Sequence, residues 1–384
     1  MPWRSHSTMS LRLEFVQRAL DEGANVRALC RAFEVSPKTA YKWLRRYEQS
    51  GAEALSDQSR RPHASPNRTS AELKERIVAL RRQHPDWGAR KLRRRLLVLG
   101  ASALPAPSTI TAILHRRDLI DPRESALHEP CRRFEAAAPN DLWQMDFKGD
   151  FPLLCGARCA PWTALDDHSR FSLGLKACTE MDRAIVRGHL VDTFREHGLP
   201  LAILCDNGPP WGTCGQEGLT GYTALGVWLL RLGVRLVHSS ICHPQTLGKD
   251  ERFHRTLKRE VLAHHPEGFL GSQECQRALD QWQRIYNYER PHEALGLAVP
   301  AERYRASERV YPEVLPPLSY GSSDIVRRVH DQGEIFFRGK RLRIGRAFSG
   351  LDVALRETTT DGCYDVIFAT KAVAQIKLKE HITD

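Results

Sequence analysis

The sequence lacks any run of apolar residues long enough to cross a membrane. Its most apolar region, residues 227–237, is interrupted by Arg231 and Arg235, whereas a membrane-spanning helix needs about 20 consecutive apolar residues. The first residues, MPWRSHSTMS, also lack the apolar core of an export signal. We therefore expect a cytoplasmic protein that has no membrane partner.

Patterned cysteine is absent as well. The chain has 10 cysteines, but they do not form an even framework, which argues against a disulfide-stapled secreted protein and suits a reducing compartment. Cys155 is followed by Cys159, but no Cys or His pair follows at zinc-site spacing, so we do not expect a structural zinc ion. The sequence has no Walker-type phosphate-binding loop either, and it predicts no nucleotide cofactor.

The chain does have an excess of positive charge, and that excess lies at one end. The net charge is +11. Residues 1–133 hold 26 Lys and Arg against 14 Asp and Glu, a net charge of +12, whereas residues 134–384 hold 31 against 32, a net charge of −1. A basic segment joined to a neutral body is typical of a protein that binds a polyanion, most simply nucleic acid. A solvated basic surface without a ligand would have the same charge, so charge alone does not decide.

The basic third of the chain begins with a predicted three-helix module. The apolar spacing predicts helices over residues 11–22, 26–33 and 38–49, and Ser36 followed by Pro37 is a helix start signal. Three short helices with a basic third helix are typical of a helix-turn-helix domain, although a plain three-helix bundle has the same periodicity. The basic outer face of the third helix favours DNA contact by Lys38, Thr39, Lys42, Arg45 and Arg46.

A second helical module follows a basic, Pro-containing linker at residues 51–70. Helices are predicted over residues 72–84, 88–99 and 109–117, with Ser108 as the N-cap of the last one. The middle helix carries the densest cation group of the chain, which we expect to contact DNA: Arg90, Lys91, Arg93, Arg94 and Arg95. Two tandem modules of this kind suit a long, bipartite site in double-stranded DNA.

At residue 142 the pattern changes from helical periodicity to alternation. We predict a mixed α/β sheet, because three successive strands are followed by alternating helices and strands. The predicted strands are residues 142–147, 162–167, 171–176, 201–205 and 234–239, and the predicted helices are residues 182–197, 222–231 and 273–288. Short strands after residue 325 predict a small β-barrel at the end of the chain.

Three acids occupy positions that suit metal-dependent phosphoryl chemistry. Asp146 lies on the polar face of the first strand, Asp206 follows a buried strand, and Glu251 is near the start of an amphipathic helix. Carboxylates that converge on one sheet edge repel each other unless cations neutralise them. Mg²⁺ or Mn²⁺ fits such a site, and two ions roughly 4 Å apart can activate an attacking hydroxyl and stabilise the leaving oxygen of a phosphodiester. The neighbouring Asp250 falls on the apolar side of the helix, so we assign the role to Glu251.

The motifs around these acids resemble a known family. WQMDFKG around Asp146, the segment ALDDHSR, CDNG at Asp206 and HPQTLGKDERFHRTLK around Glu251 are similar to the integrase-type core of bacterial insertion-sequence transposases. That core belongs to the retroviral-integrase, ribonuclease-H-like superfamily with an Asp-Asp-Glu triad, and the resemblance covers about 150 residues, the span of a domain. It implies that the three acids are catalytic metal ligands. It also implies cleavage at transposon ends, followed by attack of the freed 3′-hydroxyl on target DNA.

The sequence departs from the family pattern at two places. Asp206 and Glu251 are further apart than in retroviral integrases, and residues 209–221 account for the difference as a loop. Asp250 stands where relatives commonly have a small apolar residue. We expect Asp167 to hold a turn, with a supporting role near the metal ions left open. Contacts to the DNA strand at the site are expected from Gln245, Lys249, Arg252 and Lys258, with plain surface charge as the alternative.

The sequence therefore predicts a DNA transposase that binds terminal inverted repeats and catalyses end cleavage and strand transfer. We expect it to act as a homo-multimer on bacterial nucleoid DNA, because two transposon ends must be joined to one target. A catalytically retired DNA-binding regulator and a structure-specific nuclease of the same fold are the alternatives. The predicted domains are a helix-turn-helix domain with its linker (1–68), a second, winged-helix-like helix-turn-helix domain (69–125), a linker (126–140), a ribonuclease-H-like core (141–295), a Pro-rich linker (296–320) and a β-barrel (321–384).

Overall fold

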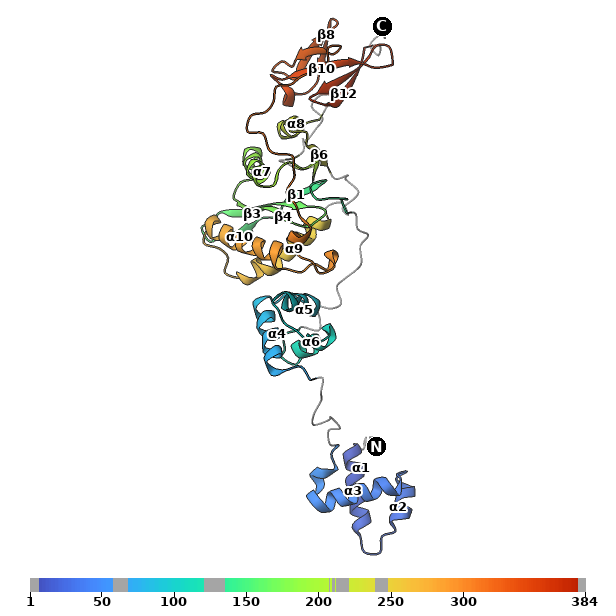
Figure 1. Cartoon of the computed structure of the whole chain (residues 1–384). Helices are drawn as coiled ribbons and strands as arrows, with labels where there is room; N and C mark the ends of the chain where they lie inside the picture. Colours follow the sequence, from blue (N-terminus) through green and yellow to red (C-terminus); the bar gives the residue numbers. More distant parts are fainter. Residues whose placement is uncertain are drawn as a thin grey trace. The chain divides into compact units, whose positions relative to one another are not determined.

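The structure is a computed structural model that describes residues 7–57, 68–120, 135–206, 208, 211, 221–238 and 248–378 (Figure 1). The chain divides into two compact units, residues 1–68 and 69–384. Within the described ranges, no helix has the length and apolar character needed to cross a membrane.

The first unit is the predicted three-helix module. It contains helices α1 (Thr8–Leu20), α2 (Val26–Ala32) and α3 (Pro37–Ser50), followed by the short 3₁₀ helix η1 (Ala52–Leu55). The predicted start of the third helix is confirmed, because the Ser36 side chain accepts a hydrogen bond from the Thr39 N–H and Pro37 takes the first helical position. Trp43 is buried at the centre of the module, and the Arg12 guanidinium lies 3.9 Å from the centre of its ring.

The second unit begins with the second helical module, α4 (Ala71–Gln83), α5 (Ala89–Val98) and α6 (Pro107–His115). The expected N-cap of the last helix is wrong. Ala106, not Ser108, is the N-cap residue, and Pro107 opens the helix, a position where the missing N–H of proline costs no hydrogen bond. The core of this module forms around Trp87, and Ile285, which lies later in the same unit, packs against it.

The mixed sheet of the second unit is confirmed. Its strands are β1 (Trp143–Phe147), β2 (Phe151–Pro152), β3 (Arg158–Asp166), β4 (Ser172–Cys178), β5 (Ala202–Cys205) and β6 (Arg235–His238). Strand β3 pairs with β4 and with β1, β1 pairs with β5, and β5 pairs with β6. The β1–β3 and β3–β4 pairs are antiparallel, whereas the β1–β5 and β5–β6 pairs are parallel. Three hairpin-type strands followed by parallel strands make a ribonuclease-H-like sheet.

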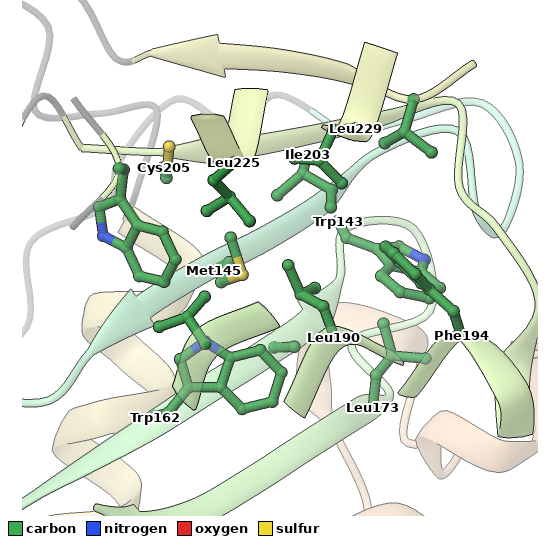
Figure 2. Close-up of a cluster of buried hydrophobic side chains, with 14 of the residues drawn as sticks. Trp143, Met145, Trp162, Leu173, Leu190, Phe194, Ile203, Cys205, Leu225 and Leu229 are labelled. Atoms are coloured by element: carbon green, nitrogen blue, oxygen red, sulfur yellow. The ribbon is translucent and has the colours of Figure 1, made fainter. Parts of the chain in front are cut away.

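Helices cover both faces of this sheet (Figure 1). Helices α7 (Arg183–His197) and α8 (Ala224–Arg231) lie on one face, and α9 (Gly248–Glu260) and α10 (Ser272–Tyr288) lie on the other. Figure 2 shows the cluster under α7 and α8, in which Trp143 of the sheet packs against Phe194, with 5.7 Å between the ring centres. Gly174 belongs to this packing, because an added Cβ would lie 2.4 Å from the Trp162 ring.

The chain ends in a β-rich region that follows a strap along the core. After η4 (Leu262–His264), η5 (Glu293–Leu295) and α11 (Pro300–Arg303), the strands are β7 (Ile325–Arg328), β8 (Glu334–Phe337), β9 (Lys340–Arg343), β10 (Asp352–Glu357), β11 (Cys363–Phe368) and β12 (Lys371–Lys377), with η6 (Arg346–Phe348) before β10. The expected short strands are confirmed. They form a four-stranded sheet, β12-β11-β10-β7, and a β8-β9 hairpin, and over residues 325–378 these pairings do not close a barrel.

Outside α11, the Pro-rich segment over residues 296–320 forms neither helix nor strand, and it is bound to the core. The Leu199 N–H donates to the Arg309 carbonyl at 2.7 Å. Arg195 of α7 forms two hydrogen bonds of 2.8 Å with the Glu313 carboxylate. The segment therefore attaches the C-terminal strands to α7 and to the loop that leads from α7 into the mixed sheet.

Candidate active site

The three predicted acids are carried by neighbouring elements of one sheet edge. Asp146 lies in β1, Asp206 directly follows β5, and Glu251 lies in the first turn of α9. β1 and β5 are parallel, with Gln144 opposite Leu204. Extending this register along both strands places Asp146 beside Asp206. The carboxyl end of parallel strands is where open α/β sheets place their sites.

The ionisation of Asp146 depends on the other two acids. Its pKa is raised to about 6, chiefly by burial and also by the charges of Asp206 and Glu251. The Phe147 N–H, which donates to Oδ1 of Asp146 at 2.7 Å, opposes the rise. Asp206 and Glu251 therefore each lie within electrostatic range of Asp146. A cation among them would relieve the repulsion.

Asp206 is oriented by the turn that follows β5. Its Oδ1 accepts a hydrogen bond from the Gly208 N–H at 3.1 Å, and its backbone carbonyl accepts one from Nδ1 of His238 at 2.9 Å. A Cβ added to Gly208 would lie 3.2 Å from Oδ2 of Asp206. Glycine at this position therefore leaves space beside the carboxylate.

Glu251 is exposed on a helix whose opposite face is buried. Phe253 and Leu257 pack into an apolar cluster shared with α10 and the sheet, which confirms the predicted apolar stripe. That packing fixes the rotation of α9 and leaves the Glu251 side chain outside the core.

His254 links the same helix to the sheet. Its Nε2 lies 2.9 Å from the Thr163 hydroxyl, and its Nδ1 lies 3.9 Å from Oδ2 of Asp146. Burial lowers the pKa of His254 to about 4, and the charge of Lys148 lowers it too. The imidazole is therefore neutral at pH 7 and adds no positive charge beside the acids.

Asp250 is enclosed in the protein and differs sharply from Glu251. Its side chain is 0% exposed, and neither carboxylate oxygen has a hydrogen-bond partner among the described residues. Burial raises the pKa of Asp250 well above its ordinary value, and the charges of Asp146 and Asp167 raise it too. Burial and these charges favour the neutral form of the Asp250 carboxyl over the charged form that a metal ligand needs, which favours Glu251 as the ligand.

The donor set fits a hard divalent cation, because all three groups are carboxylates. Within the described ranges, no three His, Cys, Asp or Glu side chains are gathered closely enough to hold a metal ion. The charges of Asp206 and Glu251 raise the pKa of Asp146, which indicates that both acids are near it. For all three carboxylates to bind one ion, the Glu251 side chain would have to move toward the other two. Because Glu251 is exposed, no packed neighbour among the described residues opposes that movement.

The DNA-contact candidates of α3 line one side of that helix. Lys38, Lys42 and Arg45 are exposed. Thr39 is half-buried, with its hydroxyl 2.9 Å from that of Ser36. Arg46 is half-buried, and its guanidinium lies 5.0 Å from the ring centre of Trp43.

The cations of α5 face acids of the catalytic core. Nη2 of Arg95 lies 2.5 Å from Oε2 of Glu289, while the Arg90–Glu293 and Arg94–Glu302 pairs are longer, at 3.9 and 3.8 Å. Burial lowers the pKa of Lys91 to about 8, with the charge of Arg290 as the next cause, and Arg93 donates to the Pro105 carbonyl at 3.1 Å. Sequence reasoning missed these acids, because they follow α10 without any periodic pattern. DNA contact by the five cations stays a prediction.

The predicted DNA contacts around α9 divide into three groups. Arg252 and Lys258 are exposed. Gln245 lies outside the described residues. Lys249 is turned inward instead, with its Nζ 2.5 Å from Oδ2 of Asp167.

Comparisons with known families agree with this arrangement. Residues 136–244 and 232–300 match integrase core domains. Residues 11–63 match a helix-turn-helix domain, and residues 39–114 match a homeodomain-like domain. Residues 324–384 match the C-terminal domain of IS481 family transposases. The fold and the acids thus define an integrase-type core behind helix-turn-helix domains.

With this set of matches, the chain is similar to insertion-sequence transposases, the family that the motifs also resemble. A curated relative is the insertion element IS407 uncharacterized 31.7 kDa protein of Burkholderia multivorans, 27% identical over 165 residues, or 43% of this chain and 55% of the relative. The chain thus spans about half the length of that relative.

Solved structures of viral integrases resemble the chain at low scores. The HTLV-2 integrase catalytic core domain has a TM-score of 0.34 and 16% identity, covering 44% of this chain and 100% of that one. The integrase of a simian T-cell lymphotropic virus intasome has a TM-score of 0.37 and 15% identity, covering 79% and 96%. The BIV integrase core has a TM-score of 0.32 and 21% identity, covering 42% and 92%.

Proposed function

We propose that this protein is an active DNA transposase that cuts the ends of its element and joins the freed 3′-hydroxyls to target DNA. One observation carries the proposal. Asp146 and the position of Asp206 lie side by side at the carboxyl edge of two parallel strands, and the charges of Asp206 and Glu251 raise the pKa of Asp146. Like charges that raise the pKa of a buried carboxyl are typical of functional sites.

The three acids would hold Mg²⁺ or Mn²⁺, with two ions as the proposed number. Such ions lower the pKa of the attacking water or hydroxyl and stabilise the leaving oxygen. Asp146 and Asp206 supply carboxylates fixed by the strands, and the exposed Glu251 supplies one that can approach from α9. The neutral His254 bonds to Thr163 and takes no proton from the nucleophile.

DNA recognition is assigned to the two helical modules. Lys38, Lys42 and Arg45 of α3 are proposed to face DNA directly, with Thr39 and Arg46 beside them. In the second module, Arg90, Arg93 and Arg94 line a cleft of about 320 Å³ against residues 296–298, and a DNA phosphate is the proposed occupant. Arg252 and Lys258 are proposed to hold the strand that is cut.

The remaining parts of the proposal follow from the reaction. Joining two ends needs more than one active site, so a homo-multimer on DNA is proposed, acting at the bacterial nucleoid. The domain boundaries are proposed as predicted from the sequence. The C-terminal domain is proposed to be a small, partly open β-barrel, because residues of the four-stranded sheet and of the β8–β9 hairpin share one apolar core.

The proposal is tested with purified full-length protein and duplexes that carry the ends of the element. In Mg²⁺ or Mn²⁺ we expect 3′-end cleavage and joining to a target plasmid, and in excess chelator we expect neither. Full joining in chelator would contradict the metal-dependent mechanism. Specific end binding without cleavage under any metal condition would instead support the retired DNA-binding regulator.

A further inference from the structure

Asp167, in the turn between β3 and β4, is a buried carboxylate with an unusual set of partners. It is 0% exposed. Its Oδ2 accepts a hydrogen bond from the Ala136 N–H at 2.7 Å and lies 2.5 Å from Nζ of Lys249. Its Oδ1 accepts a hydrogen bond from Nε2 of Gln144, also at 2.7 Å. One carboxylate therefore joins three separate segments of the chain.

Two of those partners come just before proposed catalytic acids. Gln144 precedes Asp146 by two positions in β1, and Lys249 precedes Glu251 by two positions in α9. In a strand, residues two apart project from the same face. Holding the Gln144 side chain therefore orients the strand segment from which Asp146 projects.

The Lys249 contact acts on the helix. Nζ of Lys249 reaches both the carboxylate of Asp167 and its backbone carbonyl, the latter at 3.2 Å. Two residues along a helix amount to a rise of about 3 Å and a rotation of about 200°, so Lys249 points inward where Glu251 points to solvent. The packing of Phe253 and Leu257 fixes the middle and the second half of α9, and the Lys249 contact fixes its first turn.

The neighbouring Asp166 provides an internal comparison. It is also 0% exposed, but its Oδ1 accepts hydrogen bonds from the backbone N–H and hydroxyl of Ser169, and its Oδ2 accepts one from the Asn140 N–H. These contacts stabilise the turn and the approach to β1. None of these contacts reaches α9, whereas Asp167 contacts β1 through Gln144 and α9 through Lys249.

We propose that Asp167 is a positioning residue which, through Gln144 and Lys249, sets the separation of Asp146 and Glu251 and thereby the affinity of the acid cluster for divalent cations. The inference rests on the proposed metal-dependent function. It also gives Lys249 a role inside the protein in place of the DNA contact expected from the sequence. Arg170 and Glu135, which pair with each other at 3.2 Å, also act on the charge of Lys249, and Asp250 lies within range of the charge of Asp167.

The test measures Mn²⁺ binding directly, by calorimetric titration of the full-length chain without DNA. We expect Asp167→Asn and Lys249→Gln to weaken Mn²⁺ binding at least tenfold, and Lys249→Arg to restore most of it. The same variants should raise the Mg²⁺ concentration for half-maximal strand transfer by a similar factor. Asp166→Asn is the matched control, and it should lower the melting temperature while leaving the Mn²⁺ affinity unchanged.

Wild-type Mn²⁺ affinity in folded Asp167→Asn and Lys249→Gln would overturn the inference, and so would an equal loss in Asp166→Asn. If Asp167→Asn does not fold by circular dichroism, Lys249→Gln and Gln144→Leu decide by the same criterion. Asp146→Asn separates this result from failure of the proposed function. If the wild type binds no Mn²⁺, or if Asp146→Asn binds it normally, the metal site itself is wrong. If Asp146→Asn alone loses binding, the metal site stands and only the role of Asp167 fails.

Discussion

Arg95 and Glu289 join the second helical module to the catalytic core, with 2.5 Å between Nη2 and Oε2. Close to them, Nε of Arg290 lies 2.9 Å from Oε1 of Glu260, and both of those side chains are 10% exposed. Ile285 adds an apolar contact to the core of the module. The module of α4, α5 and α6 is therefore anchored through α5. The cations of α5 form contacts within the protein, in addition to any contacts that they form with a ligand.

The Arg95–Glu289 pair should contribute measurably to stability. In a double-mutant cycle of Arg95→Ala and Glu289→Ala, we expect a coupling energy of about 1 kcal/mol, because Arg95 is half-buried and the contact is close. Urea unfolding of the full-length chain measures it. The Arg117–Glu75 pair of the same module is the control, since both side chains are more exposed, and it should couple by less than about 0.5 kcal/mol. Equal coupling in the two pairs would mean that the α5 contact is only a surface ion pair.

Asp250 should cost the protein stability. Its carboxyl is fully buried without a hydrogen-bond partner among the described residues, and such a group costs about 1–3 kcal/mol. We therefore expect Asp250→Val to raise the free energy of unfolding by about 1–2 kcal/mol in urea titration. Arg255→Val, at an exposed position of the same helix, should change it by less than about 0.5 kcal/mol. A destabilised Asp250→Val chain would show that the carboxyl has a favourable role that its contacts do not reveal.

Much of this architecture could be predicted because it follows from local patterns. Alternation around Asp146 indicates a half-buried strand, and the spacing of Phe253 and Leu257 indicates which side of α9 is buried. The contact of Lys249 with Asp167 could not be predicted, although Lys249 precedes Phe253 by four residues and so lies on the buried side of α9. A lysine charge favours solvent, and its partner Asp167 is distant in the chain. The contact of α5 with the acids that follow α10 could not be predicted for the same reason. Its cations have the composition of a DNA-binding surface, and only the fold brings the acids after α10 to meet them.

His292 should make stability fall in mild acid. Burial lowers its pKa well below the ordinary value, and the charges of Arg290, Lys91 and Arg170 lower it further. The unfolded chain binds a proton at this residue below about pH 6.5, whereas the folded chain does not, so the free energy of unfolding decreases as the pH falls below that value. The slope from this group approaches about 1.4 kcal/mol per pH unit.

The variant His292→Gln should reduce that slope in urea titrations between about pH 6.5 and pH 5. His115→Gln, at an exposed position of α6, is the control and should leave the slope as it is in the wild type. An unchanged slope in His292→Gln would place the acid sensitivity at other groups, of which His84 is one, since burial also lowers its pKa.

The three acids should be needed for chemistry and not for end binding. We expect Asp146→Asn, Asp206→Asn and Glu251→Gln each to reduce strand transfer by about a thousandfold or more, because each removes a charge that the transition state uses. Gel-shift affinity for the terminal repeats should stay within about twofold, since α3 and the second module are untouched. Asp250→Asn is the control for a nearby acid outside the site and should retain joining. Robust joining by Glu251→Gln together with loss in Asp250→Asn would exchange the two assignments.

The first unit should carry sequence recognition without supporting the fold of the second. Because residues 1–68 form a compact unit of their own, a chain that begins at residue 69 should keep its melting temperature and lose specific binding to the terminal repeats. Lys42→Ala and Arg45→Ala in the full-length chain localise the effect to α3. If these side chains contact phosphates, each should lower the slope of log K against log salt by about one. Glu48→Ala, on the same helix, is the control. Specific binding that survives removal of residues 1–68 would assign recognition to the second module.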